Sequence, residues 1–159
     1  MNPSDVLKYG NRTVLQTLEG IPDARWTGTG VCGHWTVKDV IAHLASYELI
    51  LTDVLNGFLR GGPTPVLDKY RTDMNFNDSE VNLRASKTPR HVLAEYQENF
   101  ACNAQLAAKI PTETWRKPGT LPWYGMEYSL EDYIVYAFYG HKREHSAQIA
   151  VFKDTLKLQ

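Results

Sequence analysis

His141 and His145 are four positions apart, a spacing that can place two imidazoles beside one metal ion. On an α-helix, residues four apart share a face, with Cβ atoms about 6 Å apart. Both histidines fall on a helical stripe with Ile134, Phe138 and Phe152, so we expect them to project into the core. Two neighbouring imidazoles in a core need polar partners, because an unpaired buried polar group destabilises the fold. A shared metal ion would satisfy both rings.

A third histidine, His43, lies on another helical stripe with Val40, Tyr47 and Val54, so it is also predicted to face the interior. A lone histidine on an apolar face is more often a hydrogen-bonded core residue than a ligand. Three inward histidines on two neighbouring helices favour a metal. A set of three leaves a coordination position open for water or substrate, as in catalytic sites.

Other residues near this centre are predicted from their positions along the chain. Tyr47 lies one turn after His43, and Trp123 and Tyr124 lie in a long connection, so these three aromatics are candidates for a substrate pocket. The alternative is that they only cap the core. Glu48 follows His43 by five residues and is expected to be a surface acid that points away from the metal. Ligating histidines must be neutral, so metal affinity is expected to fall as the pH drops through about 6.5.

Four segments with helical periodicity must position these residues: 4–18, 37–58, 88–110 and 129–152. Thr36 with Asp39, and Ser129 with Asp132, have the spacing of capping boxes and mark two of the helix starts. Strand patterns are absent, so the sequence predicts an all-α fold, a four-helix bundle.

One connection is unusually long. Residues 61–87 separate the second and third helical segments, whereas bundle connections usually have about 2–8 residues. A connection of this length can run the whole length of a helix, so we predict a long crossover between helices 2 and 3. Residues 73–85 could form a short helix within it.

The bulk composition is that of an ordinary globular protein. Of 159 residues, 43% are hydrophobic and 22% charged, and the formal net charge is -1. Neither nucleic acid nor a membrane surface is therefore an expected partner. No signal peptide or membrane-spanning stretch is recognisable, so a cytoplasmic location is expected. Cys32 and Cys102 are expected to be free thiols.

Two segments together resemble the DinB-like family. The first is GHWTVKDVIAHL at residues 33–44, with a tryptophan, a threonine cap and a histidine eight residues after the tryptophan. The second is YGHKREHSAQI at residues 139–149, which contains HxxxHxxQI. Both occur in the family's order, and the helix layout agrees along nearly the whole chain.

This resemblance implies that residues 1–159 form a single DinB-like four-helix-bundle domain. It also implies a divalent metal ion, usually nickel or zinc, held by His43, His141 and His145. Family members commonly form homodimers. Some are transferases or isomerases that use a low-molecular-weight thiol, and others have been described as metal-dependent hydrolases.

The function predicted from the sequence is therefore that of a metal-dependent enzyme acting on a small-molecule substrate, either a thiol-dependent transferase or a hydrolase. The alternative is a non-catalytic, dimeric helical binding protein whose metal is structural or absent. A family resemblance supports a site better than it supports a reaction.

Overall fold

The described part of the chain, residues 2–156 of a computed structural model, is helical and contains no strand, only an isolated β-bridge between Cys32 and Trp35. The predicted all-α class is confirmed. The long helices are α1 (Pro3–Leu18), α2 (Val37–Leu59), α5 (Pro89–Ala107) and a continuous run of α7 (Leu130–Tyr133), η2 (Ile134–Gly140) and α8 (His141–Leu156). None of the described helices has the length and apolar character needed to cross a membrane.

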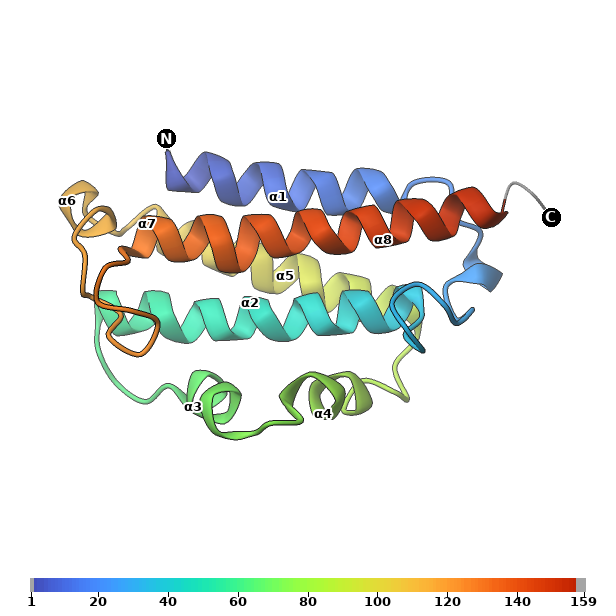
Figure 1. The fold of residues 1–159 in the computed structure, drawn as a ribbon, viewed down its shortest axis with the longest axis horizontal. Coiled ribbons are helices and arrows are strands. Elements are labelled where there is room, and N and C mark those ends of the chain that lie inside the picture. Colours follow the sequence, from blue (N-terminus) through green and yellow to red (C-terminus); the bar gives the residue numbers. More distant parts are fainter. Residues whose placement is uncertain (1, 157–159) are drawn as a thin grey trace.

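The long helices lie side by side, and the crossover between α2 and α5 runs along the outside of α2 (Figure 1). The crossover holds two short helices, α3 (Pro65–Thr72) and α4 (Phe76–Asn82), where one short helix was expected. A short 3-10 turn, η1 (Asp23–Arg25), and the four-residue α6 (Thr112–Trp115) lie in other connections. The molecule is therefore more elaborate than a simple four-helix bundle.

Helix α3 was not predicted because a residue distant in sequence stabilises its start. Asp53 of α2 accepts hydrogen bonds from the backbone N–H groups of Val66 and Leu67, at 2.7 and 3.0 Å. These groups belong to the first turn of α3, where a helix has no internal partners for its N–H groups. Asp53 lies 13 residues before Val66 and in another helix, so a local sequence pattern does not reveal this cap.

Two capping boxes fix where the helices that carry the three histidines begin. The Thr36 hydroxyl accepts a hydrogen bond from the Asp39 N–H, and the Asp39 carboxylate accepts one from the Thr36 N–H. Ser129 and Asp132 form the same reciprocal pair at the start of α7. The predicted helix starts are therefore confirmed, and with them the depth of His43 within α2.

A π-helical segment, η2, precedes His141 directly. A π-turn holds more residues than an α-turn, so it changes which side chains face inward after it. Beyond η2, Lys142 is buried together with His145, Ser146 and Ile149. Lys142 was not among the residues predicted to face the core.

Gly10 allows α1 and α8 to approach each other. A Cβ atom at this position would lie 3.3 Å from Cδ of Lys142 and 3.5 Å from a ring carbon of Tyr139. Glycine lowers the intrinsic stability of a helix interior by about 1 kcal/mol relative to alanine. At this position, the absence of a side chain allows close packing against the aliphatic part of the buried Lys142.

We predict that Gly10→Leu destabilises the protein by about 1–3 kcal/mol, because the new side chain has no room between α1 and α8. The matched control is Gly57→Ala in α2, where a Cβ would meet no atom within 4 Å. This control is expected to be stabilised by up to about 1 kcal/mol. Thermal unfolding followed by circular dichroism measures both, and a Gly10→Leu variant as stable as the wild type would contradict the packing described here.

Candidate metal centre

Three histidine side chains from two helices converge inside the bundle. His43 projects from α2, and His141 and His145 project from α8. Nε2 of His141 lies 2.9 Å from Nε2 of His43 and 2.9 Å from Nε2 of His145. The potential ligand atoms of all three lie within 4.8 Å of one another. His43 and His145 are buried and His141 is half-buried, so the cluster lies at the edge of the core.

The protons available to neutral imidazoles cannot satisfy this cluster. Nδ1 of His145 lies 2.8 Å from the Gln148 side-chain oxygen, which places the single proton of that ring on Nδ1 and leaves its Nε2 bare. His141 can donate to only one of its two Nε2 neighbours, and it can accept from His43 only if its own Nε2 is bare. At most one of the two short contacts is therefore a good hydrogen bond. A cation between the three nitrogens would use every Nε2 lone pair at once.

The histidines are held neutral, as metal ligands must be. Burial, together with the nearby His141 and His145, lowers the pKa of His43 to about 2. Burial also lowers the pKa of His141 to about 3, with contributions from His145 and from the charge of Lys142. The pKa of His145 is lowered mainly by burial. In the folded protein, protons therefore compete with a metal ion for these nitrogens only well below pH 6.5. From the sequence alone, this competition is expected at about pH 6.5.

Aromatic side chains enclose the cluster. The ring of Trp35 lies 4.9 Å from that of His43, between centroids, and the ring of Tyr47 lies 4.7 Å from His43 and 4.4 Å from His141. The Trp35 indole N–H donates a hydrogen bond of 3.2 Å to Asp78 of α4. The crossover therefore braces the wall of the site.

Tyr47, the first of the candidate pocket residues, is thus in contact with two of the three histidines. Burial raises the pKa of Tyr47, and the neighbouring Tyr70 of α3 raises it further, so this phenol stays protonated at neutral pH. Tyr70 is partly exposed and contacts Tyr47 with a centroid separation of 5.6 Å. A pair of phenol groups therefore connects the surface with the histidine cluster.

The other two candidate pocket residues make ring contacts with aromatic residues other than the clustered histidines. Trp123 and Tyr124 pack on Tyr133, with ring centroids 5.4 and 4.8 Å away. Their connection lies at the end of the bundle where α2 ends and α7 begins (Figure 1). The ring contacts of both residues are with other aromatics of that end and with Arg71, and none of these contacts is with a histidine.

Gln148 and Trp35 also contact the histidine cluster, although neither was predicted as a site residue. Gln148 orients the His145 ring from one turn further along α8, and a partner on the second ring nitrogen of a ligand is the usual arrangement in metal sites. The spacing HxxxHxxQ in the sequence could have indicated the role of Gln148. The tryptophan eight residues before His43 carried the signal for Trp35.

Glu48 was expected at the surface, and this expectation is wrong. Its side chain is completely buried and forms an ion pair with Lys142 of α8. The reason is that α2 packs against α5 as well as facing α8, so most of its circumference is covered. A charged residue in such a position requires a charged partner, and the partner lies 94 positions away in the sequence.

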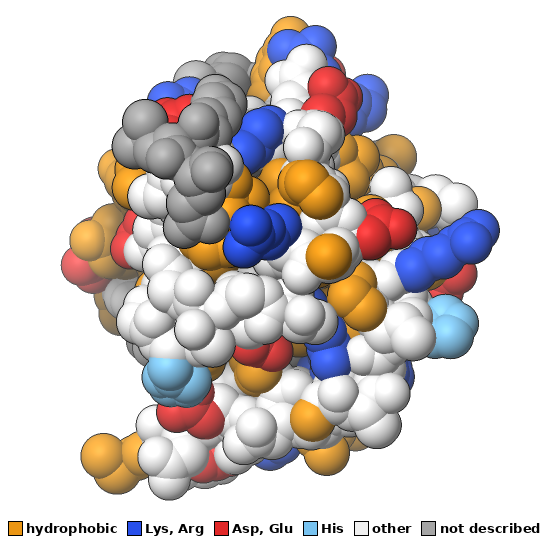
Figure 2. All heavy atoms as spheres, turned by 90° about the vertical axis from the view of Figure 1, so that its right-hand side faces the viewer, with side chains coloured by type: hydrophobic (Ala, Val, Ile, Leu, Met, Phe, Trp, Pro, Cys, Tyr) orange, Lys and Arg blue, Asp and Glu red, His pale blue; other side chains and the backbone are white. Residues whose placement is uncertain are grey.

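The remaining histidines, His34 and His91, are exposed. At the end of the bundle shown in Figure 2, exposed histidine side chains lie among interspersed acidic and basic groups. Acidic and basic side chains are therefore mixed on this face, and neither sign of charge dominates it.

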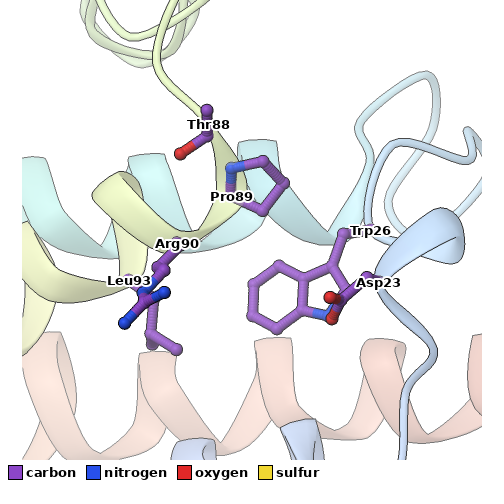
Figure 3. Close-up of a pocket in the computed structure, with 6 residues that line it drawn as sticks. All are labelled: Asp23, Trp26, Thr88, Pro89, Arg90 and Leu93. Atoms are coloured by element: carbon purple, nitrogen blue, oxygen red, sulfur yellow. The ribbon is translucent and has the colours of Figure 1, made fainter.

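A separate hollow of about 420 Å³ lies between η1 and the start of α5. The indole of Trp26 faces Pro89 and Leu93 across it, with Asp23 and Arg90 at its rim (Figure 3). None of the three clustered histidines lines this hollow.

Comparison with known families identifies the chain. Residues 10–129, about three quarters of its length, match the mycothiol maleylpyruvate isomerase N-terminal domain family. The chain belongs to that family, which is part of the DinB/YfiT-like helical superfamily. The matched region contains His43 and ends before His141 and His145. Searches of the curated proteins and of the solved structures gave no match.

The lowered histidine pKa values predict a pH-dependent stability of the metal-free protein. Above pH 6.5 these histidines are neutral in both states. As the pH falls below 6.5, the unfolded chain takes up protons that the folded protein does not bind, so the free energy of unfolding decreases. For His43 and His141, each contribution is up to about 1.4 kcal/mol per pH unit.

Urea unfolding of the metal-free protein between pH 7.5 and 5 measures this dependence. The slope is expected to be shallower in His43→Leu, which removes one of these groups. Equal stability at pH 7.5 and pH 5 in the wild type would contradict a neutral, buried histidine cluster.

Proposed function

We propose that this protein is a metal-dependent enzyme that uses a low-molecular-weight thiol, with His43, His141 and His145 as the ligands of a divalent ion. The observation that carries the proposal is the convergence of three neutral imidazole nitrogens at the edge of the core. Three nitrogen donors leave room for an exchangeable ligand, the pattern of catalytic rather than structural sites. Nickel and zinc both suit imidazole donors.

The family favours a thiol as cosubstrate. Its name refers to a mycothiol maleylpyruvate isomerase, and mycothiol is a low-molecular-weight thiol. A divalent ion held by the three histidines supplies Lewis acidity, which favours the deprotonated form of a thiol or of water at neutral pH. The same Lewis acidity would also serve hydrolysis. An experiment is therefore needed to distinguish a thiol-dependent transferase from a hydrolase.

The chain's own residues supply the rest of the site. Gln148 holds the His145 ring in one orientation. Trp35 and Tyr47 provide aromatic walls that limit access of water to the cluster. The protonated phenol of Tyr47 lies against His43 and His141, where it can contact a bound substrate. That the chain is a single domain and forms a homodimer stays a prediction.

The proposal predicts thiol-dependent turnover. Protein loaded with zinc or nickel is incubated with a low-molecular-weight thiol and an activated aryl halide, and in parallel with an activated ester and no thiol. We expect thioether formation in the first reaction and its loss in His145→Ala. The control variant His91→Ala changes an exposed histidine and should retain full activity.

Ester cleavage without thiol-dependent transfer would replace the transferase assignment with a hydrolase. Absence of turnover in both reactions, with several thiols and both metals, would contradict an enzymatic role.

A further inference from the structure

We propose that the buried ion pair between Lys142 and Glu48 is a positioning device that sets α8 against α2, and thereby sets the approach of His141 to His43. The proposal rests on the metal site proposed above for its functional meaning. The positioning itself is a property of the bundle and is testable without metal.

The pair is an unusual feature of a helical core. Lys142 is 2% exposed and Glu48 is 0% exposed, and their charged groups are in direct contact. The second carboxylate oxygen of Glu48 accepts a hydrogen bond of 2.8 Å from the Asn103 amide. The same amide donates to the Glu48 backbone carbonyl at 2.7 Å, and Thr52 donates to the Asn103 side-chain oxygen at 2.8 Å. The carboxylate is therefore held from two helices.

Lys142 is in contact with every other long helix. Its stem lies against Gly10 of α1, where a Cβ would come within 3.3 Å. Its ammonium group pairs with Glu48 of α2. It also lies 5.5 and 5.2 Å from the ring centroids of Tyr96 and Phe100 on α5, within the range of cation–π attraction. The single side chain of Lys142 thus pairs with a charge on α2, lies near aromatic rings of α5 and packs against a glycine of α1.

A role in positioning explains this pair better than a role in stability. Buried ion pairs replaced by apolar residues of similar volume often leave stability unchanged or increase it, because desolvating two charges is costly. A charged pair nevertheless penalises misalignment strongly, since sliding a helix by one residue moves it 1.5 Å and separates the charges inside the core. Apolar side chains tolerate such a shift far better.

The helices that form the site need this alignment. The close backbone packing of the bundle pairs α2 with α5 and α1 with η2 and α8, whereas α2 and α8 meet mainly through side chains. Lys142 directly follows His141, and Glu48 directly follows Tyr47, whose ring touches His43 and His141. An axial displacement of α8 that separated the ion pair would therefore also separate the Nε2 atoms of His43 and His141, now 2.9 Å apart.

The test is the double variant Glu48→Met with Lys142→Met, which removes both charges and keeps the volume. We expect it to fold with a Tm close to that of the wild type. Its affinity for Co²⁺ should fall by about 10- to 100-fold, the usual effect of losing the support of a ligand. Its Co²⁺ absorption spectrum, which reports the coordination geometry, should also change.

The control is Glu80→Met with Arg84→Met, which removes another buried ion pair, one that lies in the crossover and is also linked to Lys69 and Glu95. This control is expected to retain the wild-type Co²⁺ affinity and spectrum whatever its Tm. A folded Glu48→Met, Lys142→Met variant with wild-type Co²⁺ affinity and spectrum would overturn the proposal. If that variant does not fold, Glu48→Asp is tested instead, because it keeps both charges and shortens the acidic side chain by one methylene. A changed Co²⁺ affinity and spectrum would support the proposal, and unchanged values would overturn it.

A metal-free crystal structure of the double variant separates this proposal from the proposed function. We expect the distance between Nε2 of His43 and Nε2 of His141 to lengthen beyond hydrogen-bonding range, and an unchanged distance of 2.9 Å would overturn the positioning role. Failure of the wild type to bind Co²⁺ would refute the metal site, and the positioning role would then be decided by this distance alone.

Discussion

The alignment of α2 with α8 is the constraint on which the rest of the molecule depends. His43 and His141 are 98 positions apart in the chain, yet their ring nitrogens approach to 2.9 Å. This approach requires that both helices begin at fixed residues, that α8 has the right rotation after η2, and that neither helix slides along the other. Capping boxes meet the first requirement, the π-helical segment the second, and we assign the third to Lys142 and Glu48.

Most buried polar groups in proteins have a hydrogen-bond or ionic partner, and several in this bundle do. Glu48 has Lys142 and Asn103, and His145 has Gln148. Nδ1 of His43 and of His141 makes no hydrogen bond with the described residues, and the three Nε2 atoms compete for too few protons. The histidine cluster thus brings together at one point Nε2 lone pairs that a ligand from outside the chain could use.

The sequence predicted the features that local rules determine. Helical spacing predicted which way His141 and His145 point, and side-chain caps at Thr36 and Ser129 predicted two helix starts. Features that depend on distant pairing were not predictable in this way. The cap that Asp53 provides for α3 joins separate elements, as does the ion pair between Glu48 and Lys142. Lys142 lies four residues after the buried Phe138, a helical spacing that can direct it inward, but the burial of its charge depends on the distant Glu48.

The most direct test of the account is the metal content per chain, measured by elemental analysis on untagged protein. The wild type is compared with His43→Ala and His141→Ala after incubation with nickel or zinc and removal of unbound ions. We predict about one divalent ion per chain in the wild type and its loss in both variants, since each removes one of three ligands. A wild type that binds neither metal, or variants that bind as much metal as the wild type, would contradict the central claim that these histidines form a metal site.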